Sequence, residues 1–204
     1  MGLGKTLQTI CILAAAHDDQ RRAGHSRNPS IVVCPPTVAM HWVNEIKKFA
    51  GKHLSTLLYM GAPGERRPLL SQLAAAGDVV VVCSYEILRS DAELLLKNRS
   101  FLYCVLDEGH VIKNAKSKIA QSVKTVRAEH RLMLSGTPIQ NNVIEVWSLF
   151  DFLMPGFLGT AKQFHDRYGK PILASRDAKA SSKEQEQGIV PPTLPTPTLP
   201  TPSL

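Results

Sequence analysis

The sequence predicts an α/β fold of three layers, in which helices cover both faces of a parallel sheet. Short apolar runs rich in β-branched residues recur along the chain, and proline, glycine or polar residues bound each run. Such runs are typical of strands buried on both faces. Longer segments with helical periodicity separate them. The chain of 204 residues is 44% hydrophobic, which is enough to bury a sheet of this kind.

The predicted elements alternate along the chain. Strands are expected at residues 31–34, 56–59, 79–83, 102–106 and 131–134. Helices are expected at residues 6–16, 38–49, 66–76, 87–96, 115–126, 143–153 and 161–168. Alternation of this kind favours crossover connections between parallel strands. Ligands bind at the carboxyl ends of such strands, so the residues that follow the strands are the first candidates for a site.

The composition changes near the C-terminal end. The folded body is expected to end near residue 173, because the sequence then turns polar and loses its aromatic and branched residues. We expect residues 174–188 to form a polar linker and residues 189–204 a disordered Thr/Pro-rich tail, since proline lacks the amide donor that helices and sheets need. Such a tail can bind an SH3 or WW module, but an inert low-complexity tail is the favoured interpretation.

Charge and cysteine content narrow the classes of protein. The formal net charge of +7 is compatible with a polyanion such as nucleic acid and equally with an ordinary basic protein. The four cysteines, Cys11, Cys34, Cys83 and Cys104, lie in apolar runs without C-x-x-C spacing. This pattern argues against a metal site or a disulfide framework and predicts reduced thiols in an intracellular compartment. No apolar stretch approaches the roughly 18 residues of a membrane span, so we expect a soluble protein without membrane contact.

The first residues, "MGLGKTLQTI", contain half of a phosphate-binding motif. Gly4, Lys5 and Thr6 match the end of the pattern G-x-x-x-x-G-K-[ST] and directly precede a predicted helix. In that pattern backbone amides hold phosphate, the lysine reaches the β and γ phosphates and the hydroxyl binds Mg²⁺. By itself the triplet is also compatible with a glycine turn before a helix.

Two further strand ends carry polar residues. In "VLDEGHVIKN", Asp107 and Glu108 follow a buried run, where one carboxylate can hold Mg²⁺ and its neighbour can orient an attacking water. His110 beside this pair is a candidate coupling residue. In "LMLSGTPIQN", Ser135 and Gly136 follow another short run. Each segment alone could be a simple turn, but three such strand ends together indicate a nucleotide site.

These segments resemble motifs of the Swi/Snf chromatin-remodelling branch of superfamily 2 helicase-type ATPases. The segments that carry the resemblance are "MGLGKTLQTI" for the end of motif I, "IVVCPPTVAMHWVNEIKKF" for motif Ia, "VVVVCSYEIL" for motif Ib, "VLDEGHVIKN" for motif II and "LMLSGTPIQNNVIEVWSLFDFLMPGFLG" for motif III with its extension. Residues 1–173 are therefore similar to the first RecA-like, P-loop NTPase lobe of that family. The resemblance implies ATP and Mg²⁺ as cofactors.

The resemblance also implies roles for single residues. The residues that would bind phosphate are Gly2, Gly4, Lys5 and Thr6, with Thr6 and Asp107 holding Mg²⁺ and Asp107 and Glu108 forming the catalytic pair. The residues that would couple nucleotide state to movement are His110, Ser135, Gly136 and Thr137. The residues that would face DNA are Pro35, Pro36, Thr37, Ser84 and Tyr85. Within motif Ia, Trp42 and Phe49 lie on one helical face and are interpreted as core residues.

The partners follow from the same resemblance. It implies double-stranded DNA as a partner, a nuclear location and a part in transcription regulation. The sequences of the segments "DEGH" and "PGFLGTAKQFHDRYGKPILASRDAK" are most similar to those of the remodelling ATPases associated with TATA-binding protein. TATA-binding protein is therefore the suspected protein partner.

The sequence also departs from the family pattern. The family places a strand before the glycine loop and a second RecA-like lobe after the first, and the sequence begins inside that loop. We therefore expect a lobe whose N-terminal strand is missing and whose ATP hydrolysis is weak or absent. The alternatives are a non-catalytic module that binds DNA or a transcription factor, and an unstable truncated product without a function of its own.

Overall fold

The computed structural model describes residues 4–24, 27–75, 77–136 and 143–175. The chain divides into two compact units, Met1–Pro138 and Ile139–Leu204.

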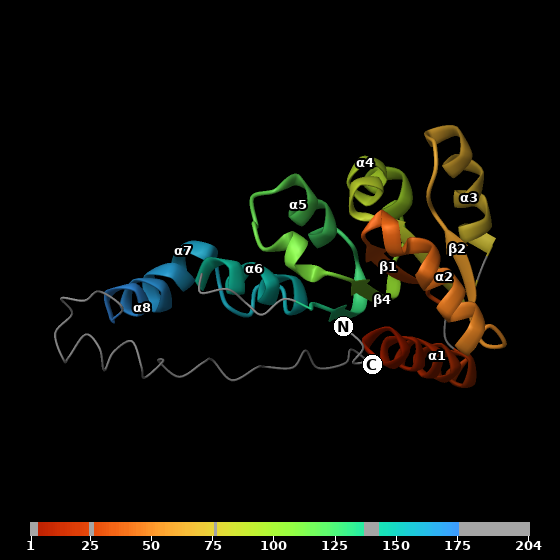
Figure 1. Ribbon diagram of the computed structural model, residues 1–204, viewed down its shortest axis with the longest axis horizontal. Coiled ribbons are helices and arrows are strands. Elements are labelled where there is room, and N and C mark those ends of the chain that lie inside the picture. The colour runs from red at the N-terminus through yellow and green to blue at the C-terminus, as the bar shows by residue number, and fades with distance from the viewer. Residues whose placement is uncertain (1–3, 25–26, 76, 137–142, 176–204) are drawn as a thin grey trace. The chain divides into compact units, whose positions relative to one another are not determined.

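A five-stranded parallel sheet forms the centre of the first unit (Figure 1). Its strands are β1 (Ser30–Cys34), β2 (Ser55–Leu58), β3 (Val79–Ser84), β4 (Phe101–Leu106) and β5 (Ala128–Met133), in the spatial order β2-β3-β1-β4-β5. Every described pairing is parallel. All five carboxyl ends therefore lie at one edge of the sheet, and the predicted α/β class is confirmed.

Helices cover both faces of this sheet. The helices are α1 (Lys5–Ala23), α2 (Pro36–Ala50), α3 (Pro63–Ala75), α4 (Tyr85–Leu96) and α5 (Lys118–Lys124). The helices α1 and α2 pack together on one face, and α4 and α5 pack together on the other (Figure 1). The connection from β1 to β2 runs toward one edge of the sheet, and the later connections, from β2 through β3 and β4 to β5, run toward the other edge. Because crossovers are right-handed, connections in opposite directions place their helices on opposite faces, in agreement with this division.

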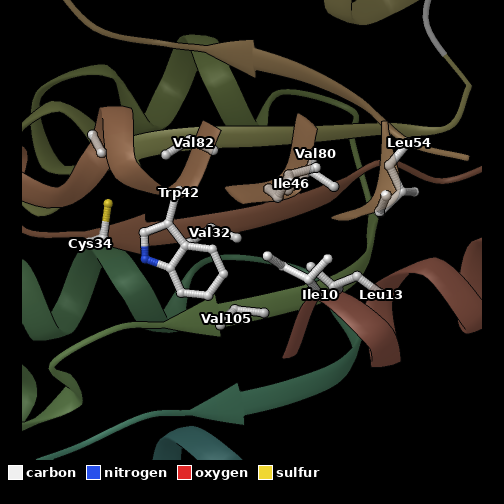
Figure 2. Packing of buried hydrophobic residues seen from close by; sticks show 12 residues of the cluster. Ile10, Leu13, Val32, Cys34, Trp42, Ile46, Leu54, Val80, Val82 and Val105 are labelled. Carbon is white, nitrogen blue, oxygen red and sulfur yellow. The ribbon is translucent and has the colours of Figure 1, made fainter. Parts of the chain in front are cut away.

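One part of the core lies between the sheet and the pair α1 and α2 (Figure 2). Alternate residues of the central strands point to this face, as the pleat of a strand requires. Its main side chains are Ile10, Leu13, Val32, Cys34, Trp42, Ile46, Leu54, Val80, Val82 and Val105. Strands β1 and β3 are buried along their whole length, which confirms that they are covered on both faces.

Three predictions about elements need correction. Strands β2 and β5 are the edges of the sheet, and in β5 every residue is at least partly exposed, so these two are not buried on both faces. The helix expected at residues 115–126 is shorter, because Ser117 accepts a hydrogen bond from the Ala120 amide at 3.1 Å and starts α5 there. A 3₁₀ turn, Gly109–Ile112, was not foreseen from the periodicity.

The second unit is helical where it is described. It contains α6 (Val143–Leu153), α7 (Ala161–Phe164), the π-helical turn η2 (His165–Gly169) and α8 (Lys170–Ser175). A capping box at Thr160 starts α7, and the Trp147 indole donates to the Gly159 carbonyl at 3.0 Å. The boundary near residue 173 stays a prediction, and residues 176–204 lie outside the described part. Among the described helices, none has the length and apolarity that crossing a membrane demands.

Candidate functional site

The N-terminus of α1 offers uncapped amides at the carboxyl edge of the sheet. Gly4 precedes the helix with a φ of 66°, in the left-handed region that favours glycine, and no side chain caps the first turn. The amides and dipole of this long helix therefore favour an anion. Thr6 lies half-buried in the first turn. Gly2 falls outside the described residues.

Three of the predicted segments meet beside this helix end. The Lys5 ammonium donates to the Ser135 carbonyl at 3.4 Å. A Cβ atom on Gly136 would lie 3.6 Å from Lys5 Nζ and 3.8 Å from Glu108 Oε1. Lys5 and Glu108 thus both reach the space beside Gly136, and the structure brings together residues that are far apart in the sequence. Thr137 lies outside the described residues.

Asp107 is held in place through both its backbone and its side chain. It directly follows β4, and its amide donates to the Val33 carbonyl at 2.9 Å. Its Oδ1 atom accepts a hydrogen bond from the Glu108 amide at 3.0 Å, and its Oδ2 atom accepts one from Trp42 Nε1 at 2.8 Å. The hydroxyl of Tyr85 donates to the Asp107 carbonyl oxygen at 2.8 Å. The carboxylate keeps further lone pairs for a hydrated cation.

Glu108 stands in a strained turn next to the candidate coupling residue. Its φ of 53° is unusual for a residue with a side chain. His110 Nδ1 lies 3.2 Å from Glu108 Oε2, and both side chains are partly exposed. Gly109 between them has no room for a side chain, because a Cβ there would lie 2.2 Å from Met133 Cγ. The turn is therefore packed directly against the end of β5.

The predicted DNA-facing residues fall into two groups. Pro36 and Thr37 at the start of α2 are exposed, and Pro35 is half-buried. Ser84 and Tyr85 are turned inward, with only 3% and 2% of their surfaces exposed. Ser84 accepts a hydrogen bond from the Ile87 amide at the start of α4. A DNA contact at this second segment would have to come from its backbone or its exposed neighbours.

Burial of the groups around Asp107 affects their protonation. Burial, together with the charge of Asp107, raises the pKa of Cys34 to about 12. The same two causes raise the pKa of Tyr85 far above its usual value, so its hydroxyl stays a donor at every accessible pH.

The core prediction for motif Ia holds for one residue of two. Trp42 is 1% exposed, as expected, but its hydrogen bond to Asp107 gives it a second role that the sequence reasoning missed. Phe49 is 46% exposed, so its assignment to the core is wrong. It lies next to the end of α2, where the Lys48 ammonium stands 4.7 Å from its ring centre. Ile46 and Ala50 are buried, so the covered face of α2 extends to its last residue and Phe49 lies at the margin of that face.

The donor set fits a magnesium nucleotide better than a metal held by protein alone. Among residues 4–24, 27–75, 77–136 and 143–175, no three His, Cys, Asp or Glu side chains gather at a possible metal site. Mg²⁺ commonly takes one or two protein oxygens and completes its shell with phosphates and water. The Asp107 carboxylate and the Thr6 hydroxyl suit that requirement. The cysteines are free, and Cys11 is exposed whereas the other three are buried.

The parallel sheet and its order define the first unit as a RecA-like α/β lobe of the kind found in helicase-type ATPases. The family model of the SNF2-related domain matches residues 1–190, and the chain belongs to this family.

Relatives of known name support this membership. The chain is 54% identical over 199 residues to TATA-binding protein-associated factor 172 of Homo sapiens and 52% identical over 197 residues to TATA-binding protein-associated factor MOT1 of Saccharomyces cerevisiae. Each match covers 93% of this chain, which spans 10% of the length of either relative. The SWI2/SNF2 ATPase core of Sulfolobus solfataricus, solved in complex with dsDNA, matches with a TM-score of 0.70 and 34% identity, covering 92% of this chain and 36% of that chain.

Proposed function

We propose that this chain is the ATP-binding lobe of a DNA-dependent ATPase that acts in transcription regulation in the nucleus. In the full-length protein, the proposed reaction drives the removal of TATA-binding protein from double-stranded DNA. The observation that carries the nucleotide part is the meeting of Lys5 and Glu108 beside Gly136, next to the fixed carboxylate of Asp107. The protein partner is supported by the names of the relatives, and the DNA by the solved complex of the Sulfolobus core.

Each group of the site has a task in this proposal. Lys5 and the amides of the first turn of α1 bind phosphate, and Thr6 and Asp107 hold Mg²⁺. Glu108 orients a water molecule and accepts its proton. When bound, Mg²⁺ neutralises phosphate charge and ATP supplies the phosphoryl group that passes to water.

The coupling residues surround Glu108. His110 stands beside its carboxylate, and Gly136 lies between Glu108 and Lys5. With Ser135 and Thr137, they are proposed to sense whether phosphate is bound. Pro35, Pro36 and Thr37, at the start of α2, are proposed to lie on the DNA side, as is the segment from Ser84 to Tyr85.

We further propose that the 204-residue chain binds ATP but turns it over slowly. Among the described residues, the basic side chain at the site is that of Lys5, and in phosphoryl transfer an arginine from across the site is worth about a thousandfold or more in rate. DNA-stimulated turnover as fast as that of a two-lobed enzyme, and abolished by Lys5→Ala, would contradict this expectation.

The test of nucleotide binding is a thermal shift with ATP and MgCl₂. We expect the melting temperature of the chain to rise, and Lys5→Ala or Asp107→Asn to remove the rise. Lys52→Ala is the matched control, because Lys52 is exposed in the turn after α2, before the amino end of β2 and away from the site. Its rise should equal that of the unaltered chain.

Other outcomes distinguish the alternatives. A cooperative melt without a nucleotide response, combined with retained DNA binding, would favour a non-catalytic interaction module. A melt without cooperativity, or recovery only as aggregate, would favour an unstable product.

A further inference from the structure

Two buried aromatic side chains from different elements each direct their polar atom to Asp107. Trp42 belongs to α2 and donates from Nε1 to the carboxylate, at 2.8 Å. Tyr85 is the first residue of α4 and donates from its hydroxyl to the backbone carbonyl, at 2.8 Å. The two helices lie on opposite faces of the sheet, so Asp107 is held from both sides.

Both aromatic side chains are buried and tightly packed. Trp42 is 1% exposed, and its ring packs against Val32, Val82 and Val105 in the core (Figure 2). Tyr85 is 2% exposed. A buried indole or phenol donor that loses its acceptor costs about 1–3 kcal/mol, so each ring keeps its partner. Because an aromatic ring is rigid and has few rotatable bonds, a displacement of either helix start is passed to Asp107 rather than absorbed.

The starts of these two helices are also the segments proposed to lie on the DNA side. Pro36 and Thr37 are exposed at the beginning of α2, the helix that carries Trp42. Ser84 caps α4 directly before Tyr85. Each of these helices therefore carries both a start on the proposed DNA side and a donor to Asp107: Trp42 donates to its carboxylate and Tyr85 to its backbone carbonyl.

We propose that Trp42 and Tyr85 are positioning residues that link α2 and α4 to Asp107, Trp42 through the carboxylate and Tyr85 through the backbone carbonyl, and so set the affinity of Asp107 for magnesium nucleotide according to what the starts of those helices bind. This inference rests on the proposed function, because it takes Asp107 as the group that holds Mg²⁺. Linkage requires the effect to be reciprocal: DNA at the helix starts changes the binding of magnesium nucleotide, and magnesium nucleotide changes the binding of DNA by the same factor.

The first test removes one donor and keeps an aromatic, though smaller, ring at this position. In Trp42→Phe the Asp107 Oδ2 atom loses its partner, and we expect the MgCl₂ concentration needed for half-maximal ATP binding to rise about tenfold, since partners of metal ligands typically have effects of this order. ATP binding without Mg²⁺, which depends on Lys5 and the start of α1, should not change. A general loss of structure would weaken both, so the split between them identifies positioning.

The matched control is Trp147→Phe. This variant loses an equivalent indole hydrogen bond, to the Gly159 carbonyl at 3.0 Å, but in the second unit. Its magnesium midpoint should equal that of the unaltered chain. Equal midpoints for Trp42→Phe and Trp147→Phe would overturn the inference.

A second measurement leaves the core of the first unit unchanged. Trp42 and Trp147 are the two tryptophans of the chain, so Trp147→Phe leaves Trp42 as the single fluorescent reporter. Addition of MgCl₂ to the ATP-bound protein should shift its emission, and Asp107→Asn should abolish the shift. Unchanged emission while magnesium nucleotide binds would overturn the inference. Failure of the unaltered chain to bind ATP with any dependence on Mg²⁺ would instead overturn the proposed function.

Discussion

Removal of one member of the buried ion pair between Arg66 and Asp91 should destabilise the first unit more than any surface charge change. Arg66 on α3 donates through Nε and Nη2 to the two oxygens of Asp91 on α4, at 2.7 and 2.8 Å. The side chains are only 7% and 12% exposed. Tyr59 and Ser90 add donors to the same carboxylate, each at 2.9 Å. Asp91 also interrupts the helical geometry of α4, so the network holds a bent helix.

Two considerations set the magnitude. The hydrogen bonds from Arg66 hold the pKa of Asp91 down from 3.8 to about 2, which corresponds to about 1–2 kcal/mol of stability after allowance for solvent screening. Breaking a buried pair by removing one partner leaves an uncompensated charge and costs about 3–5 kcal/mol. We therefore expect Arg66→Met or Asp91→Leu to lower the free energy of unfolding by about 3 kcal/mol. The double variant should lose clearly less than the sum of the two.

The assay is a double-mutant cycle by urea unfolding, followed by circular dichroism. We expect a coupling energy of about 2–3 kcal/mol for Arg66 and Asp91. The exposed pair Arg22 and Asp18, at 2.6 Å on α1, is the control, and its coupling should stay below about 1 kcal/mol. Because the pKa of Asp91 is lowered by folding, its contribution is full above pH 4 and disappears as the pH falls through 2. Equal coupling for both pairs would refute the reasoning.

Three further changes test other parts of the first unit. Burial lowers the pKa of His17, which lies 3.5 Å from Asp78, so the free energy of unfolding should fall as the pH drops below 6.5. In His17→Gln the free energy of unfolding, measured by urea titration, should depend less on pH in that range. Gly109→Ala should cost about 1–3 kcal/mol in thermal or urea unfolding, because the new methyl group meets Met133, and adding Met133→Ala should recover part of the loss. Glu108→Gly should raise stability by up to about 1 kcal/mol, since glycine accepts the positive φ without strain, and a lower melting temperature would contradict the strain argument.

The fold could be predicted from the sequence because it depends on periodicity, which is local. The all-buried runs at residues 31–34 and 79–83 became the central strands β1 and β3. The runs at residues 56–59 and 131–134 were also expected to be buried on both faces, but they belong to β2 and β5, which lie at the edges, and the order of strands in space decides burial there. A pattern within one segment carries no information about how many neighbours that segment has.

The site could be predicted in part for the same reason. Strand ends carry Asp107, Glu108 and Ser135, and parallel strands place all such ends at one edge. The hydrogen bond from Trp42 to Asp107 could not be foreseen, because an apolar helical period assigns the ring to the core and is silent about its nitrogen. Tyr85 was expected to face DNA, but the turn from β3 into α4 points it inward.

Truncation of the whole Trp42 side chain would change the stability of the fold and the geometry of the site together, so such a variant could not separate the two effects. The ring fills the core against β1, β3 and β4, while its single polar atom stands at the carboxyl edge and binds Asp107. Removing the whole side chain would cost about 3–5 kcal/mol in packing and would disturb Asp107 at once. Phenylalanine keeps an aromatic ring in the core and removes the donor, at the cost of a smaller ring volume. A higher magnesium midpoint in that variant, with ATP binding in the absence of Mg²⁺ unchanged, can therefore come only from the carboxylate that the indole positions.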